Sequence, residues 1–110
     1  MRSGLVAFAV VVLALTAACG GRTWQVRMEV DGPGTAKVVS SLAGESKNPE
    51  PVERQLPWQR DSPVGAGFNN ISVRGGAPGT VCRIFVDGKL VSERAVDASG
   101  AADCAAATQE

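Results

Sequence analysis

Two patterns of apolar residues divide the chain. Residues 5–15 are an unbroken apolar run, whereas from residue 24 onward apolar and polar side chains alternate. Alternation with a period of two predicts β-strands with one buried face, because successive side chains of a strand point to opposite sides. No segment shows sustained helical periodicity. We therefore expect an N-terminal apolar segment followed by an all-β domain over residues 24–110.

The first two alternating segments predict a hairpin. Within residues 24–30 the apolar side chains fall on one face of a strand: Trp24, Val26, Met28 and Val30. Asp31-Gly-Pro-Gly34 then ends the strand, because glycine adopts unusual backbone angles and proline lacks a backbone donor. We expect residues 35–42 to return beside the first strand.

The middle of the domain predicts a surface stretch and then another strand. Residues 44–63 contain four of the six prolines, so much of this stretch is expected to run over the surface. Its apolar residues indicate one short strand inside it: Val52, Leu56 and Trp58. Residues 68–74 predict a further strand, with Phe68 on the face opposite Ile71 and Val73.

The strongest local signal is a hairpin around Asp87-Gly88. Asp-Gly between two apolar runs is typical of a two-residue type I′ turn, which here joins residues 80–86 to residues 89–95. The register of such a turn makes three opposing pairs: Val86 and Lys89, Phe85 and Leu90, Ile84 and Val91. The buried face of the hairpin is then expected to carry Cys82, Ile84 and Val91.

Phe85 and Leu90 form an apolar pair on the other face of this hairpin. Such a pair can lie under a loop or under a second layer of the fold. It can also be exposed and serve as a contact surface. Both alternatives stand at this point, and Phe85 and Leu90 are carried forward as the candidate contact surface.

The whole pattern predicts a small immunoglobulin-like β-sandwich. We expect about six or seven short strands after the N-terminal segment, separated by frequent turns. The last of them, near residues 101–106, carries Cys104 back toward Cys82.

The apolar run at the start is typical of an export signal. Arg2 precedes it, and Thr16-Ala-Ala-Cys19 follows it. A positive start, an apolar centre of about 7–15 residues and small residues at the end make a secretory signal. Leu15-Thr-Ala-Ala-Cys19 also resembles the lipobox of bacterial lipoproteins. We therefore expect residues 1–18 to be a lipoprotein signal peptide, Cys19 to be the lipid attachment site and residues 19–23 to be a short tether.

Two alternatives stand beside the lipoprotein interpretation. The segment could stay as an uncleaved membrane anchor, since a spanning helix needs roughly 20 mostly apolar residues. Cys19 could also end a signal that is cleaved without lipidation. In the lipoprotein and anchor cases the domain is held at the outer face of the cytoplasmic membrane, within the cell envelope.

The other two cysteines predict a disulfide. Cys82 and Cys104 remain once Cys19 is assigned to the signal, and an exported protein meets oxidising conditions. The alternative is a pair of buried, unpaired thiols.

Charge and composition exclude several functions. Basic and acidic residues balance at 11 each, which offers no footprint for nucleic acid. The chain has no histidine, so it lacks the usual general base and the commonest metal ligand. Glu50 and Glu53 lie in a proline-rich stretch and are expected to be solvated. We expect no enzyme activity, no metal and no cofactor.

Several residues in a fixed order resemble a known family. They are Val30-x-Gly32-x-Gly34, then Leu56-Pro57-Trp58, then Cys82-Arg83-Ile84-x-Val86-Asp87-Gly88-Lys89-x-Val91, and finally Cys104. This order resembles the mycobacterial membrane protein small (MmpS) family over residues 26–104.

The resemblance implies a β-sandwich outside the cytoplasmic membrane, accessory to large RND-type (MmpL-like) exporters of lipids or siderophores. It also implies that Cys82 and Cys104 are the family's disulfide pair and that Trp58 fills part of the core. Family members are typically anchored by one membrane helix, whereas the apolar run of this chain ends at the lipobox-like Cys19. The chain is therefore expected to be a distant, lipoprotein-type relative. Two other functions stay open: a lipoprotein that itself binds a small apolar ligand or envelope lipid, and a purely structural envelope component.

Overall fold

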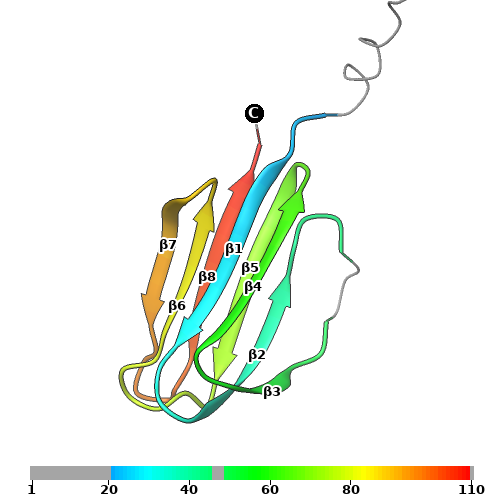
Figure 1. The fold of residues 1–110 in the computed structure, drawn as a ribbon. Helices are drawn as coiled ribbons and strands as arrows, with labels where there is room; N and C mark the ends of the chain where they lie inside the picture. Colours follow the sequence, from blue (N-terminus) through cyan, green and yellow to red (C-terminus); the bar gives the residue numbers. More distant parts are fainter. Residues whose placement is uncertain (1–20, 46–48, 110) are drawn as a thin grey trace, which may run out of the picture.

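The computed structural model describes residues 21–45 and 49–109, which form two antiparallel β-sheets packed against each other (Figure 1). The predicted all-β sandwich is confirmed. The predicted signal peptide, residues 1–18, and the predicted lipid attachment site, Cys19, lie outside the described residues. Within the described ranges, no helix is long and apolar enough to span a membrane.

The described residues form eight strands, four in each sheet. In chain order they are β1 (Trp24–Asp31), β2 (Thr35–Ser41), β3 (Val52–Gln55), β4 (Trp58–Val64), β5 (Gly67–Arg74), β6 (Val81–Val86), β7 (Lys89–Ala95) and β8 (Ala102–Thr108). The first sheet has the order β4-β1-β6-β7, and the second sheet has the order β3-β2-β5-β8.

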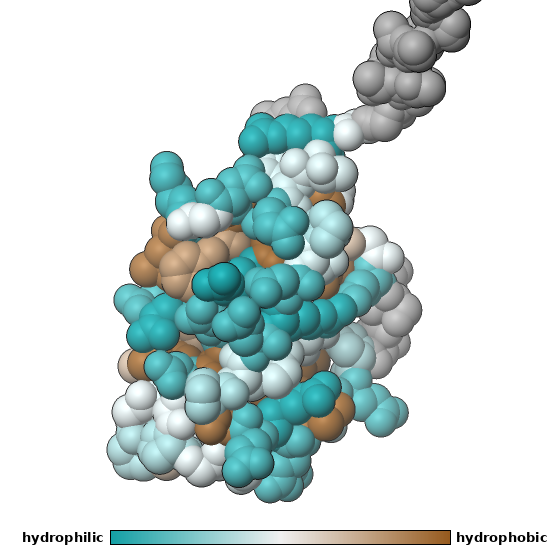
Figure 2. All heavy atoms as spheres, viewed as in Figure 1, coloured by the Kyte–Doolittle hydropathy of each residue, from teal (hydrophilic) through white to brown (hydrophobic). Residues whose placement is uncertain are grey.

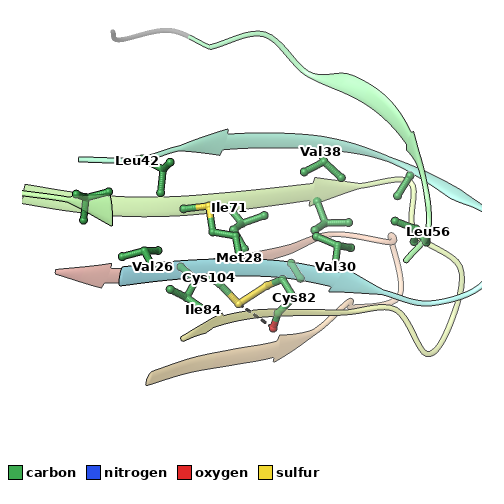
Figure 3. Close-up of a cluster of buried hydrophobic side chains, with 14 of the residues drawn as sticks. Val26, Met28, Val30, Val38, Leu42, Leu56, Ile71, Cys82, Ile84 and Cys104 are labelled. Carbon is green, nitrogen blue, oxygen red and sulfur yellow. Dashed lines mark hydrogen bonds between the residues drawn. A yellow bond between two sulfur atoms is a disulfide. The ribbon is translucent and has the colours of Figure 1, made fainter. Parts of the chain in front are cut away.

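The predicted pairing of residues 24–30 with residues 35–42 is wrong, because β1 and β2 lie in different sheets. Both edges of β1 are occupied, one by β4 and the other by β6. The turn after β1 carries the chain across the sandwich, so that Val30 and Val38 lie on opposite sides of the core (Figure 3). Gly32 allows this crossing, since a Cβ there would lie only 2.5 Å from Thr80 Oγ1. Alternation shows only that a strand has one buried face, which is equally true of two paired strands in one sheet and of two strands in facing sheets.

The stretch from residue 44 to residue 63 holds two strands where the sequence predicts one. β3 is an exposed edge of the second sheet and β4 is an edge of the first sheet. Leu56 lies between them, buried, and its N–H donates to the Gly34 carbonyl oxygen at 2.9 Å. The Leu56–Pro57 peptide bond is cis. Trp58 is half-buried and packs against the core.

The β6–β7 hairpin has the predicted turn and a different register beyond it. Val86 pairs with Lys89 and Phe85 with Leu90, as the sequence predicts. The register then shifts, so that Ile84 pairs with Ser92 and the predicted Ile84–Val91 pair is wrong. Val91 is the extra residue of a β-bulge and is 47% exposed, so it does not share the buried face with Cys82 and Ile84. Ser92 takes that place, and its hydroxyl oxygen accepts a hydrogen bond from the Ala105 N–H of β8 at 3.3 Å.

The core lies between the two sheets and is joined by a disulfide (Figure 3). Cys82 of β6 and Cys104 of β8 are bonded, with their Cα atoms 6.2 Å apart. The disulfide therefore links the first sheet to the second. Around it lie side chains with no exposed surface: Val26, Met28, Val30, Ile71, Val73 and Ile84. Ile71 and Val73 of β5 point inward and Phe68 points outward, so the prediction that they lie on opposite faces is confirmed.

Candidate contact surface on the outer face of the first sheet

A row of ion pairs crosses the outer face of the first sheet. Arg27 of β1 contacts Asp61 of β4 at 3.2 Å, and Arg83 of β6 contacts Glu93 of β7 at 2.7 Å. Glu29 lies between the two arginines, 3.6 Å from Arg27 and 3.7 Å from Arg83. These side chains share one face because alternate residues of neighbouring strands line up in register.

The charges in this row alternate in sign, with three carboxylates, Asp61, Glu29 and Glu93, around two guanidinium groups. The hydrogen bond to Glu93, helped by the carboxylates of Glu29 and Asp31, raises the pKa of the Arg83 guanidinium above its already high ordinary value. Exposed ion pairs contribute little to stability, typically about 0–1 kcal/mol each. Their arrangement in alternating sign provides donors and acceptors for a polar partner surface, and it gives no net attraction for an anion.

An apolar patch lies next to the row, at one end of the β6–β7 hairpin. Phe85 is half-buried, Leu90 is 44% exposed, and the bulged Val91 follows Leu90. We call Phe85, Leu90 and Val91 the hairpin patch. In Figure 2 hydrophobic atoms gather at the left, over β6 and β7, beside hydrophilic atoms that cover the centre. The predicted contact pair is therefore at the surface of the sandwich and accompanied by a third apolar residue.

A shallow hollow adjoins the hairpin patch. It has a volume of about 410 Å³ and is lined by Gln25, Arg27, Asp61, Phe85 and Gly88. Only Phe85 supplies a large apolar surface to this lining, while Arg27 and Asp61 are paired with each other across it. The hollow continues the combination of apolar centre and charged rim that is common in protein interfaces.

Asp87 fixes the hairpin to the start of the domain. Its backbone N–H donates to the Gln25 carbonyl oxygen at 2.8 Å, and its carboxylate accepts the Gln25 N–H at 2.9 Å. The carboxylate also lies 3.5 Å from the Arg22 guanidinium, which stacks 4.7 Å from the centre of the Trp24 ring. The hairpin patch is thus held at the end of the sandwich where the chain leads back toward Cys19.

This latch was missed by the sequence analysis. The sequence predicts only a turn at Asp87-Gly88, and the positive φ of both residues, 51° and 82°, confirms it. The second role of Asp87 depends on a residue 62 positions away, so no local pattern could indicate it. The ion-pair row was missed for the same reason, since it joins strands that are far apart in the sequence.

The described residues contain no group of three or more side chains placed to hold a metal ion. The absence of a metal, of a cofactor and of enzyme activity stays a prediction. The predicted cysteine pair lies in the core, away from the hairpin patch, so it supports the fold and adds no chemistry to this surface.

The sandwich matches the model of a known protein family. The family model described as Mycobacterium membrane protein matches residues 21–108, from just before β1 to the end of β8. The chain belongs to this family. No curated protein matches it. As a member of the Mycobacterium membrane protein family, it is a membrane-associated protein of the cell envelope, and the predicted MmpS resemblance is confirmed.

The residues that carry the family resemblance occupy structural positions. Gly32 allows the chain to cross after β1, Leu56-Pro57-Trp58 forms the crossing from β3 to β4, and Asp87-Gly88 forms the latched turn. The cysteine pair bridges the sheets. Membership of the Mycobacterium membrane protein family is therefore visible in how the sandwich is built.

Proposed function

We propose that this protein is a non-catalytic accessory subunit, lipid-anchored through Cys19 at the outer face of the cytoplasmic membrane, that docks to a large RND-type (MmpL-like) exporter of lipids or siderophores. The family supports the envelope location, since the whole sandwich matches a membrane protein family. The MmpS resemblance supplies the exporter as the partner. Two or more acyl chains hold a protein stably to a bilayer, which a lipidated Cys19 would provide.

The hairpin patch carries the docking part of the proposal. An apolar centre with an ordered rim of charges is the usual composition of a protein–protein contact. Leu90 is 44% exposed next to a half-buried Phe85, and the ion pairs of Arg27 and Arg83 border them. Asp87 ties this patch to the first residues of the domain, so a membrane tether would hold it in a constant position beside a membrane partner.

The alternative function, a carrier that binds a small apolar ligand or a lipid, is less well supported. Ligand pockets are usually enclosed and mostly apolar. The hollow beside Phe85 is lined mainly by polar and charged side chains. A second hollow, of about 380 Å³, is lined by Lys37, Glu53 and Arg74 among others. Both hollows are open to solvent and bordered by charged side chains, so neither is an enclosed apolar pocket.

Co-purification with a substituted patch tests the docking proposal. Leu90→Asp places a charge in the hairpin patch, and Val52→Asp is the matched control because Val52 is also 44% exposed and lies in the second sheet. Both proteins would be purified from membranes after mild cross-linking, and the associated proteins identified by mass spectrometry. We expect a large multi-spanning exporter with the wild type and with Val52→Asp, and its loss with Leu90→Asp.

Two results would contradict the proposal. Recovery of lipid alone with the wild-type protein would favour the carrier function. Recovery of the exporter in equal amount with both variants would show that the docking surface lies elsewhere on the sandwich.

A further inference from the structure

We infer that one end of the sandwich rests on the lipid bilayer, with the Phe68 side chain inserted at the membrane surface. This inference rests on the membrane attachment in the proposed function and names a second contact of the domain, separate from the hairpin patch. Its occupant is the lipid bilayer itself.

The end in question is the one where the chain leads back toward Cys19, which we call the tether end. Trp24 begins β1 and pairs with Val64, the last residue of β4. The chain then turns into the second sheet, where Gly67 pairs with Thr108 near the C-terminus. Figure 1 shows the start of β1, the β4–β5 turn and the C-terminus at the same end of the sandwich. Phe68, the second residue of β5, therefore lies at the tether end.

Phe68 is the most exposed large apolar side chain among the described residues, at 72%. Its exposure is built into the fold, because its neighbour Asn69 is fully buried and successive strand residues face opposite ways. The Asn69 side-chain oxygen accepts the Ala43 N–H at 2.9 Å, and its amide donates to the Ala106 carbonyl oxygen at 3.1 Å. These hydrogen bonds hold Asn69 inward and so hold Phe68 outward on a rigid strand.

The length of the tether brings this end to the membrane. Cys19 and Trp24 are five residues apart, which an extended chain spans in at most about 17 Å. If the apolar segment stayed as an uncleaved anchor, it would end at the same point of the sequence. Packed sheets lie about 10 Å apart, so Phe68 on the second sheet is within reach of the same bilayer as the tether on the first.

Charge at the tether end agrees with a lipid surface. Lys89 is exposed there, beside the turn, and Arg22 lies on the tether itself. Two described carboxylates near this end are paired with arginines: Asp87 with Arg22, and Glu45 with Arg60. Exposed aromatic side chains together with cations are the usual means by which a surface domain inserts into the headgroup region.

Two contacts, one from each sheet, would hold the tether end at the bilayer with the sandwich tilted toward the outer face of its second sheet, because Phe68 projects from that face. The tether leaves from β1 in the first sheet, and Phe68 projects from β5 in the second sheet. In this orientation the outer face of the first sheet turns away from the lipid, and the hairpin patch is free to meet the part of a neighbouring membrane protein that projects from the bilayer.

Spin labels at two matched alanines test the inference. Ala66 lies in the β4–β5 turn beside Phe68, Ala98 lies between β7 and β8 at the far end, and both are exposed. Ala66→Cys and Ala98→Cys, each in the full-length acylated protein, would be labelled with a nitroxide. The proteins would be reconstituted in vesicles of phosphatidylethanolamine and phosphatidylglycerol. Accessibility to oxygen, which enriches in bilayers, would be compared with accessibility to a water-soluble nickel complex.

We expect a severalfold higher ratio of oxygen to nickel accessibility at position 66 than at position 98. Adding Phe68→Ser to the Ala66→Cys protein should lower the ratio to that of position 98, while the protein still floats with the vesicles. Equal ratios at both positions on floating protein would overturn the inference, and no effect of Phe68→Ser would remove Phe68 from it. Protection of position 66 from both reagents would show that protein, such as a second copy, covers this end.

Failure of the attachment itself has a different signature. If the wild-type protein did not float with vesicles, or if mass spectrometry of the floating wild-type protein found no fatty acid on Cys19, the lipid anchor at Cys19 would be wrong. Absence of the exporter from the wild-type purification described above would contradict the docking function without affecting the spin-label result. The two proposals can therefore fail separately.

Discussion

Asp87 connects two parts of the molecule that are 62 residues apart in the sequence. Its left-handed backbone conformation makes the β6–β7 turn, and its carboxylate accepts the Gln25 N–H at the start of β1. Aspartate and asparagine tolerate this conformation better than alanine does. One side chain thus positions the hairpin patch relative to the tether.

Asp87→Ala tests the latch. We expect it to lower the free energy of unfolding by about 1–3 kcal/mol, because a hydrogen bond is lost and alanine is strained at positive φ. Asp87→Asn is the control, since it keeps an acceptor for the Gln25 N–H and loses only the exposed ion pair with Arg22. Denaturant unfolding of both variants measures the difference. Equal destabilisation by the two substitutions would show that the hydrogen bond is not what matters.

The contacts of the Glu45 carboxylate are expected to make the free energy of unfolding fall in acid. The Leu42 N–H, and then Arg60, donate hydrogen bonds that hold the pKa of the Glu45 carboxyl below its ordinary value. A carboxyl whose pKa is lower in the folded state contributes stability above its unfolded pKa, and that contribution disappears as pH falls through the folded value. We expect the free energy of unfolding of the wild type to fall below about pH 4. In Glu45→Gln, which lacks this carboxyl, the fall should be smaller. Denaturant unfolding between neutral pH and pH 2 checks this, and identical pH profiles for the two proteins would contradict it.

At the scale of the strands, the sequence predicts the position of each strand better than it predicts the pairing between strands. The alternation of Val26, Met28 and Val30 locates β1 and its buried face correctly. The same alternation does not indicate whether the next strand lies beside β1 or across the core. The crossing depends on the close approach of Gly32 to Thr80, which the sequence does not reveal. Pairing is local for the Asp87-Gly88 hairpin, which is why its first two residue pairs could be predicted.

The bulge in β7 can be tested against the predicted register. Ile84 is fully buried while Val91 is 47% exposed. We expect Ile84→Ala to lower the free energy of unfolding by about 2–5 kcal/mol, and Val91→Ala to change it by less than about 0.5 kcal/mol. Denaturant unfolding of the two variants gives both values. A comparable loss for Val91→Ala would favour the regular register in which Val91 faces the core opposite Ile84.

The disulfide joins strands of different sheets, so its removal affects the whole sandwich. Cys82 and Cys104 enclose a loop of about 20 residues, and closing such a loop stabilises a protein by roughly 3 kcal/mol in the chain-entropy model. We expect Cys82→Ser, Cys104→Ser and reduction of the wild type each to lower stability by a few kcal/mol. Thermal melting of oxidised and reduced wild-type protein is the measurement. Identical melting would mean that the bond does not stabilise the fold.

At the scale of the whole molecule, much of the candidate surface depends on contacts that the sequence does not reveal. The Phe85–Leu90 pair follows from the hairpin turn and could be predicted. The neighbouring ion pairs of Arg27 with Asp61 and of Arg83 with Glu29 join different strands, so they become visible only once the strand order is known. Phe68 could be placed on the face opposite Ile71 and Val73, but its exposure and its position at the tether end follow from the sandwich topology.

In the proposed arrangement, the sandwich is held to the membrane at one end and presents the hairpin patch to a neighbouring membrane protein. Three observations agree with this arrangement: the match to a membrane protein family, the hydrogen bond that holds the hairpin patch to the tether end, and the exposed Phe68 at the same end. Its central claim is that the hairpin patch meets a membrane-spanning exporter.

In-cell photo-crosslinking at single positions tests that claim most directly. A photoreactive amino acid would replace Leu90 in one strain and Val52 in another, because the two side chains are equally exposed, at 44%, on different sheets. We predict that irradiation joins position 90, and not position 52, to a large multi-spanning exporter identified by mass spectrometry. Crosslinks to lipid alone at position 90, or equal capture of the exporter at both positions, would contradict the account.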